Sequence, residues 1–126
     1  MSNSVICDRS FEFASRALKL CDRIWERGPS ARHVASQLMR SATSIGSNAE
    51  EAQEAQTKAD FIAKMSISRK EAREACWWLR LAVEANIATP DEVAWELHEA
   101  NQLLAMIRAA IRTARSSENR GSARTT

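Results

Sequence analysis

Apolar and small residues recur at helical spacing through the middle of the chain. From Phe61 to Asn86 they alternate between steps of four and three, which places them on one face of a single long helix. The members of this inner face are Phe61, Met65, Ser68, Ala72, Ala75, Leu79, Ala82 and Asn86. A second apolar stripe, on the opposite side of the same helix, comprises Ala63, Ile67, Trp77 and Leu81. A helix that is apolar on both sides is buried on both, either in a large core or between subunits.

Three other segments share this periodicity, so the pattern predicts four helices, over residues 9–27, 31–54, 58–86 and 90–115. The predicted inner seam of the first helix is Phe11, Ala14, Leu18, Cys21 and Trp25, widened by Phe13, Ala17, Leu20 and Ile24. The inner face of the second carries Ala31, Val34, Leu38, Ala42, Ile45, Ala49 and Ala52. The inner face of the fourth carries Val93, Leu97, Ala100, Leu104, Ile107, Ile111 and Ala114.

Local signals mark the ends of these helices. Gly28-Pro29 ends the first, because glycine suits the position past a helix end and proline cannot continue the helix. Ser30 is then expected to cap the second helix. Thr57, with Asp60 three residues later, resembles a capping box at the start of the third. The clearest signal is Thr89-Pro90-Asp91-Glu92, which supplies a capping threonine, a proline at the first helical position and a glutamate that reaches back.

The short corners between these helices predict an all-α fold, an antiparallel up-down-up-down four-helix bundle. The bundle forms one domain over residues 1–115, and residues 116–126 are predicted to be a disordered tail because Ala123 is their only apolar residue. One core is expected to bury Phe61, Leu79, Leu38, Leu104 and Leu18. Gly46 costs the second helix up to about 1 kcal/mol relative to alanine, so either a neighbour approaches it closely or the helix bends there.

Composition narrows the possible function classes only slightly. The chain has 126 residues, with 18 basic and 16 acidic side chains, and its net charge of +2 permits nucleic-acid contact without arguing for it. Its three cysteines, at positions 7, 21 and 76, lack metal-ligand spacing and suit reduced thiols in a cytosol. No apolar run approaches the roughly 20 residues of a membrane span, and no signal-peptide pattern opens the chain. A cytoplasmic location without membrane contact is therefore expected.

A set of short motifs carries a resemblance to a known family. They are Gln37-Leu38, Arg40-Ser41-Ala42, Ser44-Ile45-Gly46-Ser47-Asn48, Glu50-Glu51-Ala52-Gln53, Lys58-Ala59-Asp60-Phe61-Ile62, Lys64, Lys70-Glu71-Ala72-Arg73-Glu74 and Trp78-Leu79-Arg80-Leu81. These motifs resemble the small four-helix bundle proteins encoded within intervening sequences of bacterial 23S rRNA genes. The resemblance implies a left-handed bundle, often assembled as a ring-like homopentamer. It also implies kinship with the accessory protein of diversity-generating retroelements, a basic pentamer that binds nucleic acid and a reverse transcriptase.

The sequence lacks the residues that a metal site in a helical bundle requires. A carboxylate-bridged di-metal site needs inward glutamates and a Glu-x-x-His motif on two helices. Neither histidine has a glutamate three residues before it, since Ser30 precedes His33 and Trp95 precedes His98. We therefore expect no metal and no cofactor, and no motif indicates a small-molecule ligand.

One enzymatic alternative remains open. Arg27 and His33 match the loose arginine–histidine pattern of the HEPN ribonucleases, in which these side chains act on the RNA 2′-hydroxyl and phosphate. Here the pair brackets the glycine-proline corner before the second helix, rather than opening the last helix as in that family. The alternative function is thus an HEPN-like RNA-cleaving enzyme that uses Arg27 and His33.

Basic side chains gather on the outer flanks of the second and third helices. They are Arg32, Arg40, Lys58, Lys64, Arg69, Lys70, Arg73 and Arg80. Such a set could follow a phosphate backbone. Acidic residues are interleaved with it, however, and Lys70 and Glu74 form a pair of opposite sign four residues apart. We favour a salt-bridged surface or a subunit contact over nucleic-acid contact.

Assembly is the function that the pattern favours most. Ile67, Trp77 and Leu81 are ten and then four residues apart, so they return to nearly the same side of the helix and are predicted to form an oligomer interface. We expect a homo-oligomer, a pentamer according to the resemblance. The predicted function is a non-enzymatic adaptor or scaffold, with contact to nucleic acid or a nucleic-acid enzyme left open. A ring also needs a second, different patch on each subunit, which the sequence does not identify.

Overall fold

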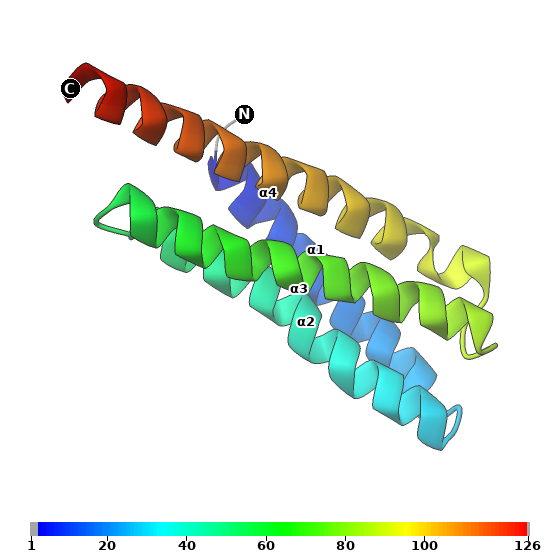
Figure 1. Cartoon of the computed structure of the whole chain (residues 1–126). Coiled ribbons are helices and arrows are strands. Elements are labelled where there is room, and N and C mark those ends of the chain that lie inside the picture. The colour runs from blue at the N-terminus through cyan, green and yellow to red at the C-terminus, as the bar shows by residue number, and fades with distance from the viewer. Residues whose placement is uncertain (1–2, 126) are drawn as a thin grey trace.

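The computed structural model describes the backbone of residues 3–125 and the side chains of residues 3–117. Over this part of the chain it consists of four α-helices without a strand, arranged as an antiparallel bundle (Figure 1). The helices are α1 (Asn3–Trp25), α2 (Pro29–Gln53), α3 (Lys58–Glu84) and α4 (Pro90–Thr125). Each packs against its neighbours in sequence, and α1 also packs against α4, which closes the bundle. The predicted all-α four-helix bundle is confirmed.

Two helix ends differ from the sequence prediction by more than two residues. The first helix begins at Asn3 instead of residue 9, because Ile6 is buried in the core and holds the first turns in place. The fourth helix continues to Thr125, past the predicted end at residue 115, and projects beyond the other helices in Figure 1. No proline breaks it after Pro90. The prediction of a disordered tail over 116–126 therefore differs from the structure for residues 116–125, and residue 126 lies outside the described part.

The corners show why α2, α3 and α4 begin where they do. Gly28 precedes α2 with a φ of 123°, and Pro29 occupies the first turn. No side chain caps this helix, so the prediction that Ser30 does so is wrong. At α3 the Thr57 hydroxyl accepts a hydrogen bond from the Asp60 amide at 3.0 Å, as predicted.

The start of α4 is a reciprocal capping box. The Glu92 amide donates to the Thr89 hydroxyl at 3.2 Å, and the Thr89 amide donates to the Glu92 carboxylate at 3.0 Å. Two backbone donors that the helix itself leaves unpaired are thereby satisfied. The prediction from the Thr89–Glu92 motif is confirmed.

The core confirms most, but not all, of the predicted buried residues. Leu38, Leu79 and Leu104 are buried, and Phe61 is partly buried against them. Leu18 is exposed, so its assignment to the core is wrong. The buried residues of α1 are Ile6, Ser10, Phe13, Ala17, Leu20, Cys21 and Ile24. Two apolar seams compete on this helix, and the one that includes Phe13 faces the bundle.

A close contact between α1 and α2 lies on the buried seam. A Cβ atom added at Gly46 would lie 3.2 Å from the Cβ of Ser10, tighter than ordinary van der Waals contact. The first of the two alternatives for Gly46, close approach by a neighbour, is therefore the correct one. Ser10 is fully buried at this contact, and its hydroxyl has no hydrogen-bond partner among the described residues. Two small residues thus let the helix backbones come together.

Candidate functional site

The outer side of α3 exposes large apolar side chains in the middle of its length. Ile67 is 42% exposed and Trp77 is 51% exposed, whereas Leu81 is partly buried against the core. The Trp77 ring packs edge-on against the Trp78 ring, with centroids 4.8 Å apart. Together with Arg80 and Glu84, Trp77 and Leu81 line a shallow hollow of about 340 Å³. Two of the three predicted interface residues, Ile67 and Trp77, are therefore about half exposed, and Leu81 and Trp77 border the hollow.

Exposed apolar residues also lie on α1, where the sequence analysis placed the core. Phe11 is 75% exposed, and Leu18 and Trp25 are each 37% exposed. Seven-residue steps bring these three side chains to nearly the same side of the helix. We call them the α1 stripe, and we call Ile67, Trp77 and Leu81 the α3 stripe. The signal that sequence reasoning missed was the presence of two apolar seams on α1, only one of which the bundle can bury.

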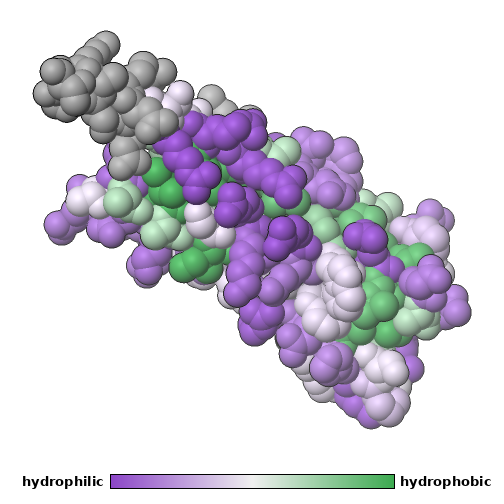
Figure 2. Space-filling view, viewed as in Figure 1, coloured by the Kyte–Doolittle hydropathy of each residue, from purple (hydrophilic) through white to green (hydrophobic). Residues whose placement is uncertain are grey.

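Apolar surface is visible in the space-filling view as well. Figure 2 shows hydrophobic patches that interrupt the hydrophilic surface on the face seen in Figure 1. None of the described helices is long and apolar enough to span a lipid bilayer. These helices carry exposed apolar residues, among them Phe11, Ile67 and Trp77, beside exposed charged ones.

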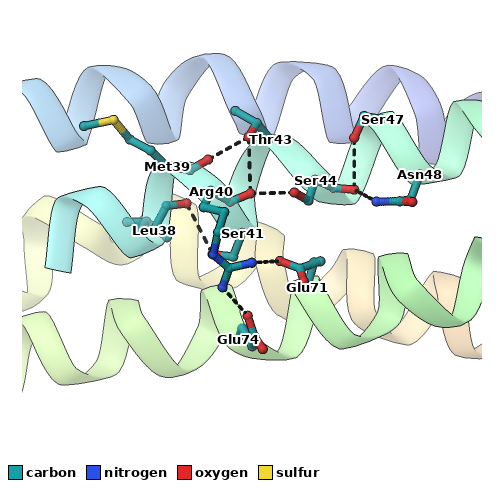
Figure 3. Close-up of polar contacts among 10 residues, drawn as sticks. All are labelled: Leu38, Met39, Arg40, Ser41, Thr43, Ser44, Ser47, Asn48, Glu71 and Glu74. Atoms are coloured by element: carbon teal, nitrogen blue, oxygen red, sulfur yellow. Dashed lines mark hydrogen bonds and ion pairs between the residues drawn. The ribbon is translucent and has the colours of Figure 1, made fainter. Parts of the chain in front are cut away.

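Arg40 lies on α2 and clamps that helix onto α3 (Figure 3). Its guanidinium donates to the Glu71 carboxylate at 3.0 Å and to the Glu74 carboxylate at 2.7 Å. The hydrogen bond to Glu74, followed by the charge of Glu71, raises the pKa of Arg40. Glu71 is only 5% exposed, so it needs this cation. Arg40, a candidate for nucleic-acid contact, is thus occupied within the subunit, and Glu74 pairs with Arg40 rather than with Lys70 as predicted.

The polar residues that follow Arg40 along α2 are satisfied locally (Figure 3). Thr43 donates to the Met39 carbonyl at 2.8 Å, and Ser44 donates to the Arg40 carbonyl at 2.7 Å. Asn48 donates in turn to the Ser44 carbonyl at 2.8 Å. Hydrogen bonds of this kind, to the carbonyl one turn earlier, occupy the donors of these side chains. This segment carries part of the family resemblance, and its donors serve the helix rather than a ligand.

The pair proposed for RNA cleavage is divided between two structural contacts. Arg27 donates to both oxygens of Glu92, at 2.8 Å and 2.7 Å, and to the carbonyl of Ile87 at 2.9 Å. The hydrogen bonds from Arg27, followed by that from the Thr89 amide, lower the pKa of Glu92 to about 2. His33 is exposed and packs edge-on against Trp78, with ring centroids 5.8 Å apart. Arg27 therefore joins the two corners at this end of the bundle, and its guanidinium is already bound.

The other basic residues that were candidates for nucleic-acid contact form no ion pair with a described carboxylate. Ion pairs among the described side chains involve Arg9, Arg27 and Arg40 on the basic side. The basic residues without an ion pair to a described carboxylate include Arg32, Lys58, Lys64, Arg69, Lys70, Arg73 and Arg80. All of these except Arg32 belong to α3. The outer side of α3 thus combines the α3 stripe with three exposed cations, Lys70, Arg73 and Arg80, that have no ion pair with a described carboxylate.

No arrangement suited to redox or metal chemistry emerges within the described residues. They contain no group of three or more histidine, cysteine, aspartate or glutamate side chains placed to hold a metal ion. The three cysteines are free, and burial raises the pKa of Cys21 to about 12. A larger hollow, of about 600 Å³, opens at the α2–α3 corner, where Gln53, Lys58 and Phe61 contribute to a mixed polar and apolar lining. It contains no cluster of catalytic groups.

Comparison with known proteins identifies the family. Residues 2–109 match the family described as 23S rRNA-intervening sequence protein. The chain belongs to this family. No curated protein matches this family member. The suspected resemblance is confirmed.

A solved structure supports the same assignment. It is the crystal structure, at 1.70 Å resolution, of a protein with unknown function from the S23 ribosomal protein family of Bacteroides thetaiotaomicron VPI-5482. Sequence identity is 31%, the alignment covers 89% of this chain and 99% of that chain, and the TM-score is 0.80. The family and its bundle fold are therefore established for this chain by sequence and by structure.

Proposed function

We propose that this family member is a non-enzymatic scaffold that self-associates through the α3 stripe, as the homopentamer that the family resemblance implies. The observation that carries the proposal is the exposure of Trp77 in the C-terminal half of α3. This helix already buries its other side in the core, yet it exposes Trp77 and Ile67 to water. Burying each large apolar side chain contributes roughly 1.5–3 kcal/mol, so association through this surface is favourable.

The local geometry of Trp77 also suits an interface anchor. Its ring is held edge-on by Trp78, and it lies beside a hollow that a side chain of another subunit can fill. An aromatic side chain that is already ordered loses little conformational entropy on binding. Tryptophans of this kind, set among neighbours that exclude water, contribute much of the energy of protein interfaces. An assembly role therefore accounts for the exposed and ordered Trp77 side chain.

The test is the mass of the particle in solution. Light scattering of the parent protein should give about five times the chain mass of 14.1 kDa. Trp77→Asp places a charge in the contact and should yield monomers with unchanged helical circular dichroism. Ala105→Asp is the matched control, because it adds the same charge at an exposed position of α4 outside either stripe. A monomeric parent, or a Trp77→Asp variant with the parent's mass, would refute the proposal.

Contact with nucleic acid or a nucleic-acid enzyme is the second candidate function, supported by the unpaired cations of α3. Lys70, Arg73 and Arg80 are exposed and lack ion pairs with described carboxylates. Contacts made with phosphates alone weaken steeply as salt rises and show little base preference. Fluorescence anisotropy with RNA over a salt series tests this. No binding at low salt, or tight binding that persists at several hundred millimolar salt, would contradict it.

RNA cleavage by Arg27 and His33 has weaker support. The guanidinium of Arg27 is held by Glu92 and the Ile87 carbonyl, so it would have to leave both in order to reach a phosphate. A nuclease assay that compares His33→Ala with the parent protein separates the enzyme from the scaffold. We expect neither protein to cleave RNA, and cleavage that disappears in His33→Ala would reverse this conclusion.

A further inference from the structure

We infer that the α1 stripe is the surface on which the α3 stripe of a second copy docks, so that the subunits join head to tail. The inference rests on the proposed self-association and supplies the second patch that such an assembly needs. A contact between two different surfaces of identical subunits continues from one copy to the next, whereas a contact between identical surfaces stops at a dimer. This chain exposes two different apolar stripes, as the continuing arrangement requires.

The two stripes match in length and direction. Phe11 and Trp25 are fourteen residues apart, and Ile67 and Leu81 are also fourteen residues apart. Each stripe is therefore about 21 Å long at a rise of about 1.5 Å per residue. In an antiparallel bundle of four helices, α1 and α3 run in the same direction. Two copies with the same orientation can thus lay the stripes side by side along their whole length, as copies related by an axis parallel to the bundle would do.

The charges beside the two stripes are complementary. Exposed charged side chains on the outer side of α1 are mainly acidic: Asp8, Glu12, Asp22 and Glu26, with Lys19 and Arg23 as the basic exceptions. The basic residues Arg9, Arg16 and Arg27 point away from this side, because they contact Glu99, Trp95 and Glu92 of α4.

The outer side of α3 carries the opposite charge. Lys70, Arg73 and Arg80 are exposed there, with Glu84 as the acidic exception, and these three cations lack ion pairs with described carboxylates. Patches of opposite sign orient two surfaces during encounter and disfavour pairing of either surface with itself. Docking of α1 on α3 is therefore favoured over α1 on α1 or α3 on α3.

Contacts within the bundle place the α1 stripe on the side of α2. Arg9 faces α4 through its pair with Glu99, and Ser10 faces α2 at Gly46. Each residue advances about 100° around a helix, so Phe11 lies beyond α2, on the outer face that α1 and α2 share.

The α3 stripe also lies toward α2. The Cys76 thiol donates a hydrogen bond to Asn101 of α4, and the Trp78 ring packs edge-on against His33 of α2. Trp77, between them in sequence, therefore points outward between these two directions. Ile67 and Leu81 fall between the directions of Trp77 and Trp78, which turns the stripe toward α2. The two stripes are thus on neighbouring sides of the bundle rather than on opposite ones. Successive copies then turn in one direction, as closure into a ring requires, instead of extending in a straight line.

Mixing two variants tests the pairing directly. Phe11→Asp spoils the α1 stripe and leaves the α3 stripe intact, whereas Trp77→Asp does the reverse. Each variant alone should be a monomer, because it lacks one half of the only productive contact. An equimolar mixture should form a heterodimer of about twice the chain mass of 14.1 kDa and nothing larger, since it contains one intact contact. Ala105→Asp should keep the parent's mass.

The outcomes separate this inference from the proposed function. A monomeric parent would overturn both. A parent oligomer with a monomeric Trp77→Asp, but with Phe11→Asp at the parent's mass, would overturn the α1 stripe alone. Dimers of either single variant, or a mixture that stays monomeric, would also overturn it, since both results exclude docking of α1 on α3. Phe11→Ser replaces Phe11→Asp should the latter lose helical circular dichroism.

Discussion

The contact between Gly46 and Ser10 makes a quantitative prediction about stability. We expect Gly46→Ala to fail to stabilise the protein, although alanine is the better helix former. A Cβ atom at this position would lie 3.2 Å from the Cβ of Ser10, whereas carbon atoms in contact prefer roughly 3.5–4.0 Å. The three atoms nearest to this Cβ all belong to Ser10, and two of them are backbone atoms of α1. They therefore have little freedom to move away.

Two effects of opposite sign decide the outcome. Replacing glycine by alanine inside a helix contributes up to about 1 kcal/mol to stability. Overpacking a tight interior contact costs about 1–3 kcal/mol. The net change for Gly46→Ala should therefore lie between about zero and 2 kcal/mol of destabilisation. In a Ser10→Gly background the obstructing Cβ is absent, so the same change should stabilise the protein by up to about 1 kcal/mol.

Urea unfolding followed by circular dichroism measures both effects as a double-mutant cycle. The expected coupling between the two positions is about 1–3 kcal/mol. All variants must be compared at one protein concentration, because self-association makes stability depend on concentration. Ser47→Ala, at the adjacent exposed position of α2, is the control and should show no coupling to Ser10→Gly. If Gly46→Ala stabilises the parent and the Ser10→Gly variant equally, the reasoning about close approach is refuted.

Two further predictions concern the ion pairs. Arg40→Leu leaves the buried carboxylate of Glu71 without its cation and should cost about 1.5–3 kcal/mol in urea unfolding, the low end being favoured because Arg40 is partly exposed. Arg32→Leu, which removes an exposed arginine without an ion pair, is the control, and an equal cost for both changes would show that the clamp contributes nothing. The pKa of Glu92 is lowered from 4.5 to about 2 in the folded state, so the charged form stabilises the fold above about pH 4.5 and this contribution is lost as the pH falls toward 2. The stability difference between the parent and Glu92→Gln should shrink over that range, and a difference independent of pH would contradict the assigned contacts.

The sequence by itself determined the helices, the fold class and one of the two exposed stripes. Helix formation depends on neighbouring residues, so periodicity and the capping signals at Thr57 and Thr89 were sufficient for most of the helix positions. The α3 stripe could be recognised because that helix has apolar residues on both sides, and a single helix can turn only one side toward a core. The motifs of α2 and α3 were specific enough to indicate the family.

The tertiary structure alone decided what depends on partners distant in the sequence. Both apolar seams of α1 have helical spacing, and the bundle buries the one that includes Phe13, on which Ser10 fits against Gly46. Arg40 could not be separated from the free cations by sequence, because its carboxylates lie 31 and 34 residues away on another helix. Spacing along one helix fixes which side chains share a side. Which side faces the core is fixed by the shapes of the neighbouring helices, and these exist only once the bundle has assembled.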